Sequence, residues 1–222
     1  MKVIFTCGGT AGHVNPALAL AGYMRKQDPT VEILFVGTPN GIERGLVAEA
    51  GYDYRGIEVG SFERSMDLDS LRHNAKSAVE LLTLRRRAQA ILREFPADLV
   101  VGTGGYASYP MVKYAALQGI PTAVHEANMI PGLTTRMLEK HAARIMVGFE
   151  ECRIHYKHPE RIVVTGTPVR GDFFDMYAHL PALFPPYRAG DQAHPGLPSP
   201  SHHLHRPAPA RGAEQPVRAA GF

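Results

Sequence analysis

The sequence predicts an α/β fold, a parallel sheet with helices on both faces, over residues 1–176. Short apolar segments typical of buried strands alternate there with segments whose apolar residues recur at helical spacing. Glycine directly follows several of the apolar segments, as expected where a strand ends and the chain turns into a helix. Beyond residue 176 both patterns stop. We therefore predict a folded domain at 1–176 and a separate tail at 177–222.

The elements follow from these patterns in chain order. The apolar run Lys2–Thr6 precedes Gly8 and Gly9 and predicts a buried parallel strand. Apolar residues at helical spacing then predict a helix at 16–24. The same reasoning predicts further strands at 32–36, 54–59, 99–101, 122–125, 144–147 and 161–164, and further helices at 42–50, 68–95 (with a break), 109–117, 133–140 and 150–156.

Composition excludes several classes of protein. Hydrophobic residues make up 45% of the chain and charged residues 20%, which is ordinary for a globular protein. A run of about 18 apolar residues, as a transmembrane helix needs, does not occur. Two cysteines, Cys7 and Cys152, make no disulfide framework and are expected to be buried small residues in a reducing cytoplasm. A net charge of +3 is too small to predict a nucleic-acid partner.

Residues 177–222 differ in composition from the rest of the chain. They hold nine of the 18 prolines and five of the 11 histidines, with no isoleucine and no lysine. Such a segment buries too little apolar surface to offset the entropy of ordering, so we predict a disordered tail. Three other interpretations remain open: a metal-binding tract at His202, His203 and His205, a proline-rich ligand, or a GC-rich gene read out of frame.

Glycine-rich loops follow two of the predicted strands. Residues 7–13 (CGGTAGH) come after the first strand, and residues 102–108 (GTGGYAS) come after the strand at 99–101. Such loops let the backbone approach a ligand, and the next helix points free N–H groups at an anion. One glycine-rich loop is equally well explained as a tight turn. Two such loops at strand ends predict room for a diphosphate between two helix N-termini.

Polar residues follow two other strands. His125 and Glu126 end one strand and are followed by Asn128, while Arg170 closes a polar turn after the last strand. Side chains of this kind at strand ends are typical of a binding site, because ligands bind beyond the carboxyl ends of a parallel sheet. For His125 and Glu126, a hydrogen bond to a neighbouring loop is an equally good explanation. Zinc-ligand spacing and dinucleotide-binding patterns are absent from the sequence.

The long helical stretch mixes apolar and basic residues. Leucines and other apolar residues at 68–84 share it with arginines and lysines at 72–87. Apolar residues beside cations are typical of a helix that lies on an anionic membrane surface. An amphipathic helix that packs on the sheet has the same pattern, and both interpretations remain open.

Four segments together resemble the MurG family of bacterial glycosyltransferases: GGTAGHVNPALALA at 8–21, GTGGYASYP at 102–110, HEANMIPGLTTR at 125–136 and VTGTPVR at 164–170. The resemblance covers about residues 1–176. It implies the Rossmann-like N-terminal half of a two-domain GT-B glycosyltransferase. The implied enzyme is an inverting hexosyltransferase that moves N-acetylglucosamine from UDP-N-acetylglucosamine to lipid I, forming lipid II. It implies no metal, no cofactor, and a peripheral location on the cytoplasmic face of the bacterial cell membrane.

The resemblance also assigns site residues. His13 is the candidate base for the acceptor hydroxyl, or alternatively only orients its loop. Positions implied to face the donor are Thr10, Ala11 (a glycine in the family), Gly12, Asn128 and Arg170. Residues implied to hold the acceptor diphosphate are Gly104, Gly105 and Tyr106. His125 and Glu126 are further cleft candidates. Residues 177–222 do not resemble the family's second domain, which implies a truncated chain with weak or no activity alone.

Two other functions remain open. A non-catalytic half-domain that binds lipid diphosphate or membrane would use the same motifs without transferring sugar. A GT-B transferase with a different acceptor is a third candidate, which the segments at 102–108 and 125–128 disfavour through resemblance.

Overall fold

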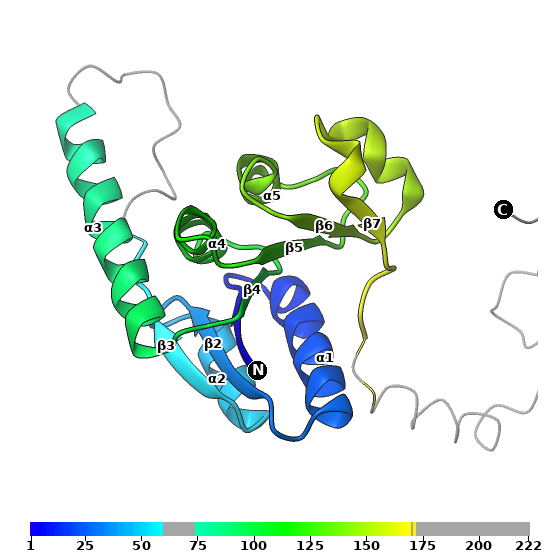
Figure 1. The fold of residues 1–222 in the computed structure, drawn as a ribbon, viewed down its shortest axis with the longest axis horizontal. Helices are drawn as coiled ribbons and strands as arrows, with labels where there is room; N and C mark the ends of the chain where they lie inside the picture. Colours follow the sequence, from blue (N-terminus) through cyan, green and yellow to red (C-terminus); the bar gives the residue numbers. More distant parts are fainter. Residues whose placement is uncertain (60–73, 170, 172–222) are drawn as a thin grey trace, which may run out of the picture. The chain divides into compact units, whose positions relative to one another are not determined.

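The computed structural model describes residues 1–59, 74–169 and 171 (Figure 1). The predicted tail, the predicted helical residues 68–73 and the candidate donor residue Arg170 lie outside the described residues. The domain boundary at residue 176 therefore stays a prediction.

The described residues form a seven-stranded parallel sheet in the order β3-β2-β1-β4-β5-β6-β7. The strands are β1 Lys2–Thr6, β2 Glu32–Gly37, β3 Asp53–Gly56, β4 Leu99–Gly102, β5 Thr122–Glu126, β6 Arg144–Val147 and β7 Ile162–Val164. All six strand pairs are parallel. This arrangement confirms the predicted α/β fold. The strands pair in parallel because a connecting helix that crosses back over the sheet brings the next strand in with the same direction.

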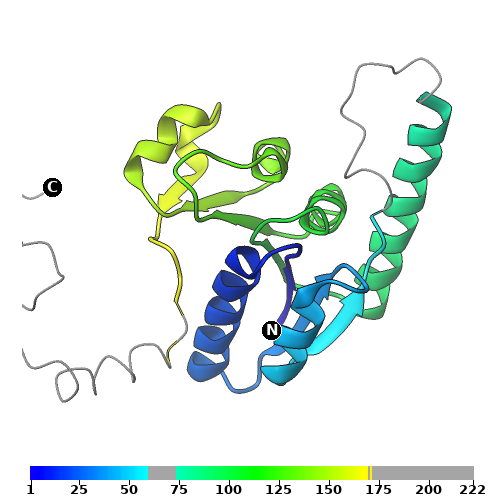
Figure 2. The same ribbon diagram turned by 180° about the vertical axis from the view of Figure 1, so that it is seen from behind.

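Helices cover both faces of this sheet (Figures 1 and 2). The first face carries α1 Ala11–Gln27 and α2 Ile42–Glu49, and the second carries α3 Asn74–Glu94, α4 Ser108–Leu117 and α5 Leu133–Leu138. Two short 3₁₀ helices, η2 Glu150–His155 and η3 Pro159–Arg161, connect β6 to β7. None of the helices in the described part of the chain is long and apolar enough to cross a membrane.

The alternation of side chains along the strands builds two cores, one on each face. Val3 and Phe5 of β1 belong to the core under α1 and α2, where Phe5 stacks on Phe35 at 5.4 Å between ring centroids. Ile4, between them in sequence, points to the opposite core under α3, α4 and α5. Successive residues of a strand face opposite sides, so a strand buried on both faces is apolar throughout.

Strand β1 lies between β2 and β4, and this placement creates the point at which a ligand can bind. The chain leaves β1 for a helix on one face, while from its neighbour β4 it leaves for a helix on the other face. The two loops therefore diverge at the carboxyl edge of the sheet and open a crevice between them. Both glycine-rich segments lie at this edge.

Helix α1 begins five residues before the predicted start. We expected a helix at 16–24 from the apolar residues at helical spacing, but Pro16 is the sixth residue of α1. Thr10 has extended backbone angles and precedes the helix, and its carbonyl accepts the N–H groups of His13 and Val14. Ala11, Gly12 and His13 therefore lie in the first helical turn, and the prediction that placed Ala11 and Gly12 in the loop is wrong.

Other elements differ from expectation at their ends. Strand β3 ends at Gly56 because its partner β2 ends at Gly37, the residue with which Gly56 pairs. Helix α5 ends at Leu138, two residues before the predicted end, and the predicted helix at 150–156 is the 3₁₀ helix η2. Helix α3 is continuous over Asn74–Glu94, so the expected break does not occur within these residues.

From residue 84 onward, α3 packs as an ordinary amphipathic helix. Leu84, Ala88 and Leu92 are buried in the core of the second face. Arg87 forms an ion pair of 2.6 Å with Glu58, across the gap between α3 and the segment after β3. Both contacts support the interpretation that this half of the helix covers the sheet.

Candidate functional site

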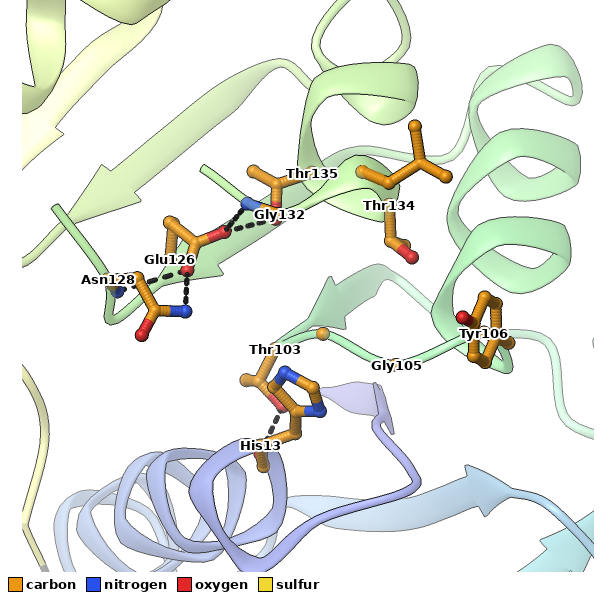
Figure 3. Close-up of a pocket in the computed structure, with 11 residues that line it drawn as sticks. His13, Thr103, Gly105, Tyr106, Glu126, Asn128, Gly132, Thr134 and Thr135 are labelled. Carbon is orange, nitrogen blue, oxygen red and sulfur yellow. Dashed lines mark hydrogen bonds between the residues drawn. The ribbon is translucent and has the colours of Figure 1, made fainter. Parts of the chain in front are cut away.

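An open pocket of about 180 Å³ lies at the carboxyl edge of the sheet (Figure 3). Three segments line it: the first turn of α1, the loop after β4, and the loop from β5 into α5. The lining residues are His13, Thr103, Gly104, Gly105, Tyr106, Glu126, Asn128, Gly132, Leu133, Thr134 and Thr135. The pocket therefore occupies the crevice that the sheet topology creates.

Gly104 and Gly105 give the loop after β4 its shape. Their φ angles are +115° and +83°, in the region that favours glycine. A Cβ on Gly104 would lie 2.8 Å from Nε2 of His13, and a Cβ on Gly105 would collide with the carbonyl oxygen of Gly8. The loop after β4 thus packs directly on the loop after β1, and only glycine permits this approach.

The backbone of the same loop offers unused hydrogen-bond donors. Within the described residues, the N–H groups of Gly104, Gly105 and Tyr106 donate no hydrogen bond. They precede α4, whose N-terminus carries partial positive charge. The Ser108 hydroxyl lies 2.8 Å from the Thr6 carbonyl oxygen and 2.7 Å from that of Gly104, which fixes the loop to the end of β1. Consecutive unpaired N–H groups of this kind suit an anion.

The loop after β1 is arranged differently. The N–H of Gly9 donates to the Glu43 carboxylate at 3.3 Å, so a protein group already satisfies this donor. Thr10, Ala11 and Gly12 are exposed and do not line the pocket. Consecutive unpaired N–H groups of the described residues thus line the pocket at the second glycine-rich loop, and a diphosphate site between the two loops stays a prediction.

His13 is oriented by the backbone beneath it. Its Nδ1 lies 2.9 Å from the carbonyl oxygen of Gly8, and 3.3 Å from the Thr10 hydroxyl. A carbonyl oxygen only accepts, so Nδ1 carries the hydrogen in this bond and the lone pair of a neutral ring is on Nε2. Thr103 adds a second constraint, because its hydroxyl donates to the His13 carbonyl oxygen at 2.6 Å. The imidazole is thus presented to the pocket with an accepting nitrogen.

Glu126 organises the opposite wall (Figure 3). One carboxylate oxygen accepts the backbone N–H and the side-chain amide of Asn128, at 3.0 and 2.8 Å. The other accepts the N–H of Gly132 at 2.9 Å and the hydroxyl of Thr135 at 2.8 Å. Glu126 is buried, with 6% of its surface exposed. Because one N–H of the Asn128 amide is held by this carboxylate, the orientation of the amide is fixed, and Oδ1 and the second N–H remain to meet a ligand.

His125 lies beneath the site rather than in it. It is 1% exposed and does not line the pocket. Its Nε2 lies 3.2 Å from the carbonyl oxygen of Gly166, to which it donates, and Nδ1 has no partner among the described residues. Burial lowers the pKa of His125 despite the opposing effects of Gly166 and Glu126. The side chain fixes the segment after β7 in the way that the hydrogen-bond interpretation expected.

This burial predicts a pH dependence of stability. The folded chain keeps His125 neutral, whereas the unfolded chain binds a proton with the ordinary pKa of 6.5. The contribution of His125 to the free energy of unfolding should therefore be fully present above pH 6.5. It should be lost as the pH drops from there through the lowered pKa. His125→Gln keeps a donor for Gly166, and its urea midpoint should fall less between about pH 7.5 and about pH 5.

His141, whose pKa burial also lowers, remains in both proteins, so the variant should still lose some stability in acid. An equal loss in His125→Gln and the unchanged chain would contradict the assignment to His125.

The pocket brings together six of the expected site residues: His13, Gly104, Gly105, Tyr106, Glu126 and Asn128. Thr103, Thr134 and Thr135 line it as well and were not expected. Thr134 and Thr135 lie in the first turn of α5, which begins directly after Gly132. Their place in this first turn was the signal in the sequence that could have identified them as site residues. Glu43, which holds the first loop from behind, was also missed.

Both cysteines are buried. Burial, and then the charge of Glu43, raise the pKa of Cys7 to about 12, so this thiol stays protonated and inert. Among the described residues, no group of three or more histidine, cysteine or acidic side chains is placed to hold a metal ion.

The chain matches known proteins over the described fold. Residues 3–147 match the model of the glycosyltransferase family 28 N-terminal domain. A transferase from Alkaliphilus oremlandii, named UDP-N-acetylglucosamine–N-acetylmuramyl-(pentapeptide) pyrophosphoryl-undecaprenol N-acetylglucosamine transferase, is 42% identical over 176 residues, which are 79% of this chain and 47% of the relative. A transferase of the same name from Thermoanaerobacter sp. is 44% identical with the same coverage. The chain thus spans about half the length of the curated relatives it matches.

Solved structures agree with this assignment. MurG from Acinetobacter baumannii superposes with a TM-score of 0.61 at 27% identity, covering 76% of this chain and 46% of that one. A Listeria monocytogenes structure described as a putative UDP-N-acetylglucosamine 2-epimerase has a TM-score of 0.55 at 14% identity, covering 74% and 44%, which shows the fold alone. The resemblance to the MurG transferases is confirmed. The chain belongs to glycosyltransferase family 28, and residues 3–147 form its N-terminal domain.

Proposed function

We propose that this chain provides the acceptor-side half of an inverting transferase that moves N-acetylglucosamine from UDP-N-acetylglucosamine to lipid I. The names of the relatives supply the reaction, and the second glycine-rich loop is the observation that carries the proposal. Three of its N–H groups, which have no partner in the described part of the chain, lie with the N-terminus of α4 beside the accepting nitrogen of His13. A lipid diphosphate held by this loop would present its sugar hydroxyl to the imidazole.

The chemistry requires one proton transfer and one displacement. The acceptor hydroxyl loses its proton to Nε2 of His13 as its oxygen attacks C1 of N-acetylglucosamine. The bond between C1 and the UDP oxygen breaks with inversion, and UDP leaves with the electron pair. Oδ1 of Asn128, the first turn of α1 with Thr10, Ala11 and Gly12, and Arg170 are the proposed donor contacts from this half.

We propose further that the acceptor is reached at the cytoplasmic face of the bacterial membrane. Leu81 and Leu82 are exposed on α3, beside the exposed Arg85 and Arg86. Apolar side chains next to cations suit a surface of anionic lipids. Binding of the chain to anionic vesicles, with weaker binding at high salt, is the corresponding measurement.

The transfer is tested in a chimaera that joins residues 1–169 of this chain to the remaining length of the Alkaliphilus oremlandii relative. We expect it to transfer labelled sugar from UDP-N-acetylglucosamine to a short-chain lipid I analogue. His13→Asn keeps a donor for the Gly8 carbonyl but removes the basic nitrogen. It should lower kcat by about 10²–10⁴-fold and leave the KM for the acceptor within about threefold.

Asn15→Ala, an exposed change two residues along α1, is the matched control and should leave kcat unchanged. A His13→Asn chimaera with full kcat would overturn the role of His13. A chimaera that binds the lipid I analogue through the second loop without any transfer would favour the alternative, a half-domain that binds lipid diphosphate.

A further inference from the structure

Glu43 is a buried carboxylate that joins two loops behind the pocket. It lies in the first turn of α2 and is 0% exposed. One oxygen accepts the backbone N–H and the hydroxyl of Thr38, both at 2.7 Å. The other accepts the N–H of Gly9 at 3.3 Å. The loop after β2 is thereby tied to the loop after β1.

The segments around this carboxylate are shaped to admit it. A Cβ on Gly8 would lie 2.9 Å from Oε1 of Glu43, and a Cβ on Gly37 would lie 2.6 Å from its Cγ. A Cβ on Gly41 would collide with both carboxylate oxygens. Burial of a carboxylate is costly unless donors replace its water, so a site built around one indicates a definite role.

One peptide unit connects Glu43 to His13. The N–H of Gly9 and the carbonyl of Gly8 belong to the same planar peptide, and they point in opposite directions. Glu43 holds the N–H end, while the carbonyl end accepts the hydrogen of Nδ1 of His13 at 2.9 Å. Because the peptide is rigid, fixing one end sets the direction of the other.

We propose that Glu43 is a positioning residue that acts through the Gly8–Gly9 peptide to keep the hydrogen of His13 on Nδ1 and the Nε2 lone pair open to the pocket. The inference rests on the proposed role of His13 as the base. It assigns a function to a residue that does not itself line the pocket.

The test is Glu43→Gln, examined by nitrogen NMR of histidine-labelled full chain at a pH where the imidazoles are neutral. The glutamine oxygen can serve the two donors of Thr38, and its NH₂ group then faces the N–H of Gly9, which cannot accept. We expect the peptide to turn and the ratio of the Nδ1–H to the Nε2–H tautomer of His13 to fall about tenfold. The His13→Asn variant identifies the His13 signals by their loss.

Thr38→Val is the matched control, because it removes a hydrogen bond to the same carboxylate but leaves the one to Gly9. It should lower stability without changing the tautomer ratio. An unchanged ratio in Glu43→Gln, or an equal change in both variants, would overturn the inference. The tautomer is read without substrate, so failure of the inference is distinguishable from failure of the proposed transfer, which the chimaera tests separately.

Discussion

Gly105→Ala is expected to destabilise the chain by about 3–5 kcal/mol, a large share of the stability of a typical domain. A non-glycine residue at φ +83° costs about 1–2 kcal/mol by itself. The added Cβ would also collide with the carbonyl oxygen of Gly8. That oxygen cannot easily move, because it accepts the hydrogen bond of His13 and Gly8 itself is buried. Urea unfolding followed by circular dichroism measures the loss.

Gly119→Ala separates the two contributions. Gly119 has φ +80°, and no atom lies within 4 Å of the Cβ that alanine would add. Only the backbone strain of about 1–2 kcal/mol is expected there. If both variants lose the same free energy, the contact between the two glycine-rich loops is not as close as the structure has it.

The fold was predictable because its signals are local. Each predicted strand exists, and β1 and β6 have the predicted bounds, since an apolar run that ends in a turn has few other interpretations. The start of α1 was missed because the apolar residues that predicted the helix begin only at Ala17, although the helix already includes Gly12, His13 and Pro16. A proline inside a helix loses one hydrogen bond, which packing of the buried residues around it offsets.

Glu43 was missed because the amphipathic pattern of α2 predicts a buried isoleucine at 42 and an exposed glutamate at 43, and the structure has the reverse. Ile42 is 53% exposed, whereas its charged neighbour Glu43 is fully buried. The reason lies outside the helix, in donors from Thr38 and Gly9 that only the folded sheet brings together. For the same reason Glu126 could be named from its strand end, but its four donors could not.

Glu126→Leu is expected to cost about 3–6 kcal/mol, because it leaves the N–H groups of Asn128 and Gly132 and the hydroxyl of Thr135 without a partner. Thr135→Val removes one of these donors and keeps the carboxylate, so it should cost about 1 kcal/mol. In the double variant the unpaired hydroxyl is gone, and the loss should be smaller than the sum of the two single losses. Additive losses would contradict direct coupling between these side chains.

Glu126→Gln sharpens the prediction, since it preserves shape and changes only the charge and one acceptor. Backbone N–H groups, which only donate, face both ends of the carboxylate, from Asn128 on one side and Gly132 on the other. Whichever end carries the NH₂ group must face one of them, so a loss of about 1–3 kcal/mol is expected. Hydrogen exchange should accelerate at one of these two amides and not at both. If the NH₂ group takes the Asn128 side, the Asn128 amide turns over to offer Oδ1 to it. Unchanged exchange at both amides would mean that the loop from β5 into α5 does not depend on the carboxylate.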